Sequence, residues 1–467
     1  MEEIFLQETE DKLQLYLIYR GVPLPSLHEE NIYSLLRQKR VTFGVQKEKI
    51  KQVLEILKNP KETYVNVKEV IAKGIAPEES IDGSYQLLIS LEPKIPMTPD
   101  GKVDHKNIEY YKIVQPKQKL VILKPPYKGK PGINIYGEEI PSKEPKPIPI
   151  TLGNNMETIP QEDKTLLGIS KIYGVLTFKE NCLDVSSDLI IEEDASIEKG
   201  NLKFNNSIFI KKNVLRGLSI FCGKNLNIEE NLESGLIRVM GNLIVKGGIH
   251  TANQGTILCK GDVFAEFIEN TNLQCEGLIQ VKNSILNSNI ICHKSILLEN
   301  PKSILIGGNI TFYEFLEVGS LGNESQITTN LYVGYHFNYQ KLLETMVDEF
   351  KKIEEETLKL SNELKEYNQK VQNKIFIPEK VRTQIPHKIQ IFNKYKETYL
   401  KKKAVIEHLK KNIFNPNPIE IKIHHTIYAG VVIHYYERKF PIMSTIFKKN
   451  IRFDPVEKMI YFQDSNH

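Results

Sequence analysis

Six short segments between residues 219 and 312 repeat one pattern, and this repeat limits the possible folds more than any other feature of the sequence. Each segment has an apolar strand, a turn that usually contains Gly, Asn or Asp, and a second apolar strand. A unit this short cannot bury its apolar face alone, so successive copies must stack. Aligned on their turns, the segments share one column, formed by Cys222, Val239, Cys259, Cys275, Cys292 and Ile306.

Stacked copies of this unit predict a parallel β-helix, in which equivalent residues of adjacent coils lie about 4.8 Å apart. The intervals along the column are 17, 20, 16, 17 and 14 residues, which indicates coils with turns of variable length. No six-residue period is visible, and this disfavours the left-handed hexapeptide form. The column is therefore predicted to be an inward-pointing ladder of small apolar side chains.

The thiols of this column could alternatively be metal ligands or disulfide partners. A structural zinc site needs four ligands that converge tetrahedrally, usually from paired Cys or His residues. The chain has no C-x-x-C pair, and thiols stacked one coil apart form a row. Five cysteines, an odd number behind a start that does not resemble a signal peptide, indicate reduced thiols in a cytoplasmic protein. We therefore predict no metal, no cofactor and no disulfide in the column.

Local hydrophobic patterns and composition predict a mainly β protein with α elements, in five parts. Residues 1–90 alternate strand-like and helix-like patterns, which is typical of a small α+β domain. Residues 91–180 are rich in Pro and Gly and contain short strands, which indicates a β-rich connector. The other three parts are the parallel β-helix at 181–338, an inserted antiparallel coiled-coil hairpin at 339–415, and C-terminal strands that return to the β-helix at 416–467.

Two heptad runs predict the coiled-coil hairpin. Apolar residues follow a three–four spacing over 343–371 and again over 385–413, with Lys388 and Lys402 in two core slots. The segment 375–386 contains two prolines and is predicted to break the helix between the arms. The second arm has ten basic and three acidic residues, which raises the question of nucleic-acid binding. It lacks aromatic residues interleaved on a sheet, so we interpret its charges as a solvated face.

The glycine-rich stretch "KPPYKGKPGINIYGEEIP" could suggest a phosphate loop. Such a loop needs backbone amides that converge at the start of a helix. Here Pro131 removes one amide, and the following residues alternate as in a strand. A β-turn structure is therefore predicted.

Carboxylates in the repeats support an alternative hypothesis, a carbohydrate- or sugar-nucleotide-acting enzyme on a β-helix. Two carboxylates at a suitable separation can hydrolyse a glycosidic bond. The chain has no Trp for a sugar platform, so we interpret these residues as parts of solvated turns. The two groups are Glu229, Glu230 and Glu233, and Glu266 and Glu269.

Segments along nearly the whole chain resemble the flagellar assembly protein A family. The strongest are "GKVDHKN", "KGKPGINIYGEEI" and "KGDVFAEFIEN". The resemblance implies an N-terminal domain, a right-handed parallel β-helix and a coiled coil, in cytoplasmic proteins of flagellar placement or assembly with no established catalytic activity. The family tends to have Ala where this chain has Cys in the column, which supports inward packing. The family has no agreed functional residues, and the positions best suited to a shared role, that of shaping a turn, are Asp104, Gly129, Pro131, Gly132 and Gly137.

The sequence as a whole predicts a non-enzymatic cytoplasmic scaffold whose β-helix and coiled-coil surfaces bind protein partners of the flagellar or polar-localisation machinery. A homo-oligomer formed through the coiled coil is a further expectation. The formal net charge of +4 is too small to indicate nucleic acid. The sequence contains no run of about 18 apolar residues, so no transmembrane helix is predicted.

Overall fold

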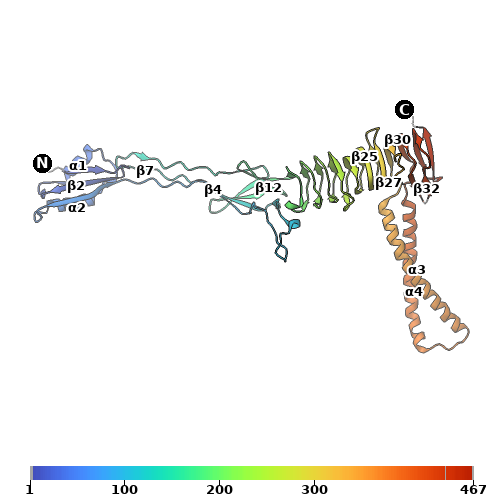
Figure 1. The fold of residues 1–467 in the computed structure, drawn as a ribbon. Helices are drawn as coiled ribbons and strands as arrows, with labels where there is room; N and C mark the ends of the chain where they lie inside the picture. The colour runs from blue at the N-terminus through green and yellow to red at the C-terminus, as the bar shows by residue number, and fades with distance from the viewer. Residues whose placement is uncertain (1–3, 437, 465–467) are drawn as a thin grey trace. The chain divides into compact units, whose positions relative to one another are not determined.

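The computed structural model describes residues 4–436 and 438–464 of the 467-residue chain. The described chain is mainly β with four α-helices and forms two compact units (Figure 1). The first unit contains residues up to Leu91 and Ile113–Ser186, and the second contains Glu92–Lys112 and the residues from Ser187 onward. The stretch predicted as one connector, 91–180, is therefore divided between the units.

An α+β module forms one part of the first unit. Strands β1 (Phe5–Glu8), β2 (Gln14–Gly21) and β3 (Val65–Lys73) make an antiparallel sheet with β2 in the centre. Strand β2 alternates buried and half-buried residues, as the period of a strand requires. Helices α1 (Glu29–Gln38) and α2 (Lys47–Lys58) are amphipathic, and their apolar residues share one core with the buried residues of β2.

The rest of the first unit is built from short antiparallel strands. One four-stranded sheet has the order β10-β11-β6-β4, and the other has the order β5-β12-β13-β9. Buried aliphatic residues from both sheets make one core cluster. The strands are β4 (Ser84–Leu87), β5 (Ile113–Val114), β6 (Lys119–Lys124), β9 (Thr151–Leu152), β10 (Met156–Pro160), β11 (Leu166–Ser170), β12 (Gly174–Lys179) and β13 (Cys182–Ser186), with a separate hairpin of β7 (Gly132–Ile133) and β8 (Glu139–Ile140).

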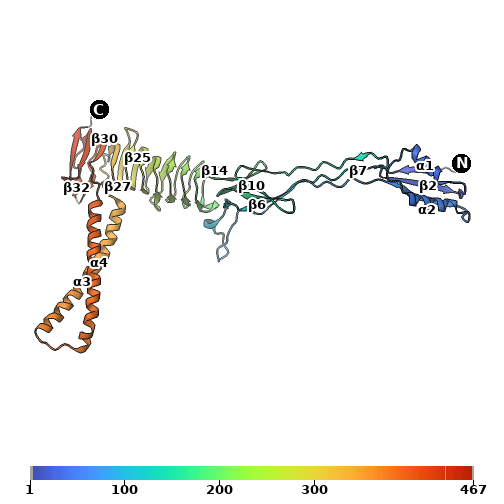
Figure 2. The same cartoon turned by 180° about the vertical axis from the view of Figure 1, so that it is seen from behind.

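The second unit is a β-solenoid of parallel coils, which confirms the predicted β-helix (Figures 1 and 2). It begins at Leu189 rather than at 181, because β13 pairs within the first unit. Inward residues are aliphatic at nearly every coil, and outward residues alternate with them. Its strands are β14 (Leu189–Ile191), β15 (Leu202–Phe204), β16 (Ile208–Ile210), β17 (Ser219–Cys222), β18 (Leu226–Ile228), β19 (Leu236–Val239), β20 (Leu243–Val245), β21 (Gly248–His250), β22 (Ile257–Cys259), β23 (Val263–Glu269), β24 (Asn272–Cys275), β25 (Ile279–Cys292), β26 (Ile296–Leu298), β27 (Ile304–Phe312), β28 (Phe315–Leu321), β29 (Thr329–Val333), β30 (Ile419–Ile427) and β31 (Val431–Tyr435).

Outward asparagines form a ladder along one edge of the coils. The Asn289 side-chain amide donates to Asn272 (2.9 Å), that of Asn309 to Asn289 (2.8 Å), and that of Asn330 to Asn309 (3.1 Å). Identical amides bond in this way because in-register coils repeat at a spacing that suits one hydrogen bond. The ladder therefore fixes the register from outside, as the apolar column does from inside.

Both ends of the solenoid are covered. Residues 92–112 pack on the first coils, where the Asn201 amide donates to the carbonyl of Lys106 (3.1 Å). At the other end the chain turns back in antiparallel strands that pair with the last parallel strands of the solenoid and with one another. Covered ends protect strand edges that could otherwise pair with other chains. The C-terminal strands are β32 (Arg438–Pro441), β33 (Ile446–Phe447), β34 (Lys449–Asp454) and β35 (Met459–Asp464).

The predicted column is wrong at its last position, Ile306. This residue pairs with Leu286 and is half-buried, in another part of the coil. Thr311 pairs with Ile291, so the fully buried Phe312 takes the place that follows Cys292. Alignment on the glycines after Ile306 misled the prediction, because those glycines form a bend inside β27 rather than the turn that closes the other repeats.

This correction predicts unequal effects of two alanine substitutions. Phe312→Ala removes a fully buried ring and is expected to lower the free energy of unfolding by about 3–5 kcal/mol. Ile306→Ala removes a half-exposed side chain and is expected to cost about 1 kcal/mol. Urea unfolding followed by circular dichroism measures both, and equal costs would contradict the observed register.

Candidate functional site: coil interior, outer face and helical hairpin

The cysteines lie inside the solenoid in one register. Cys222 pairs with Val239, Val239 with Cys259, Cys259 with Cys275, and Cys275 with Cys292. Each of the four thiols donates to a backbone carbonyl of the preceding coil, at 3.2–3.3 Å. The sulfur atoms therefore satisfy carbonyls at the turns of the coil while filling its interior.

Burial makes these thiols poor nucleophiles and poor metal ligands. It raises the pKa of Cys292 to about 12 and also raises the pKa of Cys222. The adjacent Cys259 thiol, together with burial, raises the pKa of Cys275. The thiolate is the form that reacts and binds metals, so the raised pKa values of Cys222, Cys275 and Cys292 and the burial of all four thiols disfavour both kinds of chemistry. Within the described residues, no three His, Cys, Asp or Glu side chains come together as metal ligands.

The residues of the proposed turn motif belong to different compact units. Asp104 belongs to the second unit, where its carboxylate accepts from the backbone amide of Lys106 (3.2 Å) and the side chain of Asn107 (2.7 Å) and caps the short helix η1 (His105–Asn107). Pro131 and the three glycines, Gly129, Gly132 and Gly137, belong to the first unit. Capping and turn formation account for these residues separately.

Glycines permit close approach of two extended segments in the first unit. Ile75 pairs with Ile133, and a side chain at Gly132 would collide with the backbone of Ile75. A side chain at Gly129 would likewise collide with the backbone of Glu78. The glycines therefore serve backbone packing rather than phosphate binding.

The carboxylates of the enzyme hypothesis link neighbouring coils. Glu229 pairs with Lys246, and Glu233 pairs with Arg216 at 3.6 Å. The other three carboxylates also contact a polar side chain one coil away, and the contacts are Glu230 with Asn213 (2.6 Å), Glu266 with Asn283 (3.2 Å) and Glu269 with His250 (3.7 Å). These contacts give the carboxylates a structural role in connecting coils, so we do not assign them to glycoside hydrolysis.

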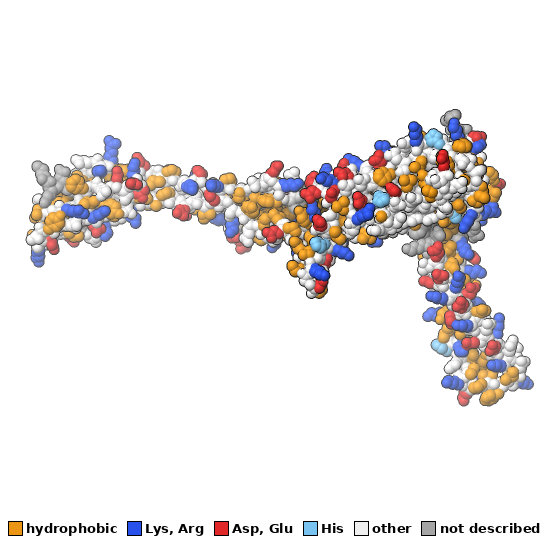
Figure 3. Space-filling view, in the orientation of Figure 1, with side chains coloured by type: hydrophobic (Ala, Val, Ile, Leu, Met, Phe, Trp, Pro, Cys, Tyr) orange, Lys and Arg blue, Asp and Glu red, His pale blue; other side chains and the backbone are white. Residues whose placement is uncertain are grey.

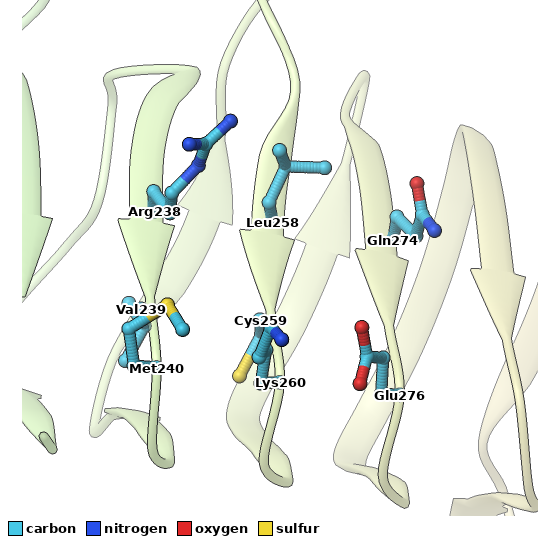
Figure 4. A pocket seen from close by; sticks show the side chains of 8 residues that line it. All are labelled: Arg238, Val239, Met240, Leu258, Cys259, Lys260, Gln274 and Glu276. Carbon is cyan, nitrogen blue, oxygen red and sulfur yellow. The ribbon is translucent and has the colours of Figure 1, made fainter. Parts of the chain in front are cut away.

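A shallow cavity of about 260 Å³ lies on the outer face beside the cysteine column (Figure 4). Its lining comes from three adjacent strands, β19, β22 and β24, and mixes two basic groups with one acidic group and aliphatic side chains. This volume is below the usual range of small-molecule sites, about 300–1,000 Å³. The outward side chains that line it are Arg238, Met240, Leu258, Lys260, Gln274 and Glu276.

The helical hairpin, residues 337–412, consists of α3 (Phe337–Gln372) and α4 (Glu379–Asn412), which lie antiparallel (Figure 2). The core slots of both heptad runs are half-buried or buried, except for the exposed Val371 at the end of the first. Phe350 stacks on Tyr399 with ring centroids 4.8 Å apart. The lysines in the core slots meet acidic partners on α3, with Lys388 pairing with Glu363 (2.6 Å) and Lys402 pairing with Glu349.

The positions of these lysines and glutamates in the heptads are a sequence signal for the ion pairs. Lys388 and Lys402 occupy core slots, and an acidic residue precedes a core slot on the first arm at Glu349 and Glu363. Polar pairs in a heptad core fix the register of the two helices at some cost in stability. The predicted helix break at Pro386 is wrong, because α4 begins after Pro378 and contains Pro386 as its eighth residue.

Aromatic residues join the helical hairpin to the solenoid. Tyr335 and Phe414 form an isolated bridge and their rings lie 4.8 Å apart. Phe414 also stacks on Tyr436, at 4.1 Å between centroids. The two ends of the hairpin are therefore held side by side on consecutive coils.

The far end of the helical hairpin encloses a second cavity, of about 380 Å³. It lies between the end of α3 and the start of α4 and is lined largely by apolar side chains, Tyr367, Ile377, Val381 and Ile385 among them. Phe376, in the connecting loop, is 85% exposed. An exposed phenylalanine beside an apolar cavity is typical of an interaction surface.

The fold and these surfaces define a class of protein, a β-solenoid protein with an inserted helical hairpin and an N-terminal α+β module. A family model described as the Flagellar Assembly Protein A beta solenoid domain matches residues 187–459, and a model for the N-terminal region of the same family matches residues 5–181. The chain therefore belongs to the Flagellar Assembly Protein A family, which confirms the resemblance of its motifs. No curated protein and no solved structure matches the chain. None of the described helices is long and apolar enough to cross a membrane.

Thiol labelling tests the assignment of the cysteines. In the folded protein at pH 8, a thiol-disulfide reagent is expected to modify Cys182, which is half-buried in β13, well before the four buried thiols. Burial keeps those four thiols inaccessible to the reagent. Peptide mapping by mass spectrometry identifies the modified residues, and a denatured sample serves as the control in which all five react. Rapid folded-state modification of Cys275 would contradict the packed column.

Proposed function

We propose that this protein is a non-enzymatic, cytoplasmic scaffold in flagellar assembly or placement, and that the helical hairpin is its docking arm for a protein partner. Membership of the Flagellar Assembly Protein A family supports the process. Paired carboxylates and protonated thiols support a role that depends on surfaces rather than on catalysis.

The observation that carries the proposal is the position of the hairpin between two strands of the solenoid. β29 ends at Val333 and β30 begins at Ile419, yet the coils stack across this gap, with β28 on β30 and β29 on β31. Coil stacking therefore does not require the 34- and 36-residue helices. A long projecting element that the core does not need is best explained by binding.

Replacement of residues 341–411 by a short Gly-Ser linker tests this role. The solenoid is expected to keep its fold, because the Asn415 amide donates to the Gly334 carbonyl (2.9 Å) and the His336 amide donates to the Ile413 carbonyl (2.8 Å), both outside the replaced segment. Swimming and the number and position of flagella are expected to be lost or altered in a flagellated host. The proposal also includes self-association through the hairpin. Light scattering of the unchanged protein and of the linker variant measures it.

A matched control changes the outer face of the solenoid instead. Arg238→Ala with Lys260→Ala removes the basic groups of the outer cavity and leaves the hairpin intact. This control is expected to support normal flagellation. Normal flagellation in the linker variant, with far-UV circular dichroism showing a folded solenoid, would show that the hairpin is not the docking element.

A further inference from the structure

The two sides of the helical hairpin differ in how their charges are used. On the first side, Glu349 and Glu363 of α3 each pair with a lysine of α4. The second side is marked by Tyr399, whose hydroxyl donates to Glu354 (3.5 Å). Glu349 comes one residue before a core slot of α3 and Glu354 comes four residues after it, so the two carboxylates flank opposite edges of the core.

The second side carries what we call the lysine face, formed by Lys351, Leu358, Lys396, Leu400 and Lys403. Leu358 is 61% exposed and Leu400 is 56% exposed. Leu400 follows Lys396 by four residues and precedes Lys403 by three, so the three side chains are neighbours on α4. None of the ion pairs in the described part of the hairpin includes Lys351, Lys396 or Lys403.

The spacing of the lysine face matches the period of a helix. Lys396, Lys403 and Lys410 are exposed and recur every seven residues, or about 10.5 Å along α4. Charges at this spacing flank the apolar seam of a coiled coil and select a partner of opposite sign. Figure 3 shows basic, acidic and apolar side chains interspersed along the hairpin.

We propose that the lysine face binds an acidic amphipathic α-helix of a partner protein. The helix lies along α3 and α4 as a third helix, with its apolar side on Leu358 and Leu400. Its carboxylates pair with Lys351, Lys396 and Lys403. This inference rests on the proposed docking role of the hairpin and names the chemistry of its partner.

Other occupants fit the face less well. A second copy presents the same lysines, so symmetric pairing of two lysine faces would bring like charges together. A membrane surface requires a broad, continuous apolar stripe, whereas Leu400 stands between Lys396 and Lys403 and Leu358 follows the charged residues Glu354 and Glu355. The phosphate backbone of a nucleic acid could pair with the lysines but presents no apolar helix face to the exposed Leu358 and Leu400.

The test uses the full-length protein and a synthetic amphipathic helix with leucine at its a and d positions and glutamate at its e and g positions. Fluorescence anisotropy measures binding, and the same peptide with lysine in place of glutamate is the reference probe. The acidic peptide is expected to bind and the basic one is not. Lys396→Glu with Lys403→Glu is expected to weaken binding of the acidic peptide about tenfold or more.

The matched control, Lys352→Glu with Lys394→Glu, makes the same change of charge at exposed positions on the first side of the hairpin. It is expected to bind the acidic peptide within about twofold of the unchanged protein. Leu400→Ala, which alters no charge, is expected to weaken binding as well. Circular dichroism verifies that each variant is folded.

Three outcomes overturn the inference: equal loss of binding in the control, equal binding of the basic peptide, or tighter binding of phosphatidylglycerol vesicles or single-stranded oligothymidylate than of the acidic peptide. Failure of the docking role itself gives a different result. In that case the linker variant that lacks the hairpin supports normal flagellation. If the linker variant fails to support flagellation and the Lys396/Lys403 variant supports it, the arm docks its partner by another surface.

Discussion

In-register stacking of parallel coils is the constraint on which the β-solenoid depends. Each inward side chain contacts the equivalent position one coil away, so a column favours apolar residues that pack against their neighbours in the adjacent coils. The four buried cysteines meet this requirement and also donate to turn carbonyls of the preceding coil. Outside, the asparagine ladder applies the same rule with amide hydrogen bonds. A change of register would break both ladders at once.

Stacking also explains where the protein can carry additional elements. Each coil contributes its strands to the ladder, while the turns between strands are free to vary in length. The helical hairpin uses one such turn, and the pairing of β29 with β31 continues past it. Charged residues of the repeats are used to connect coils, as in the pair of Glu233 with Arg216. The surfaces that remain for partners are the hairpin and the outer faces.

The sequence predicted the repeat, the solenoid and the inserted hairpin because these features have a period. Apolar residues at equivalent positions of successive repeats report burial directly, as the column from Cys222 to Cys292 shows. Prediction failed where the local pattern was ambiguous. Ile306 precedes two glycines and was aligned with turns, although Phe312 continues the column. Pro386 was expected to break the helix, because an interior proline removes one backbone hydrogen bond, but α4 continues through it.

The sequence by itself determined which residues are inside, because hydrophobic period and stacking leave one solution for the interior. It also determined the family, through motifs that span both units. Only the tertiary structure decided which distant residues share a site. It assigned Asp104 to one compact unit and Gly129, Gly132 and Gly137 to the other, and it set Lys402 against Glu349 while leaving Lys396 and Lys403 without an acidic partner among the described residues. Such pairings depend on how segments far apart in the chain approach one another, and spacing along the sequence does not encode that distance.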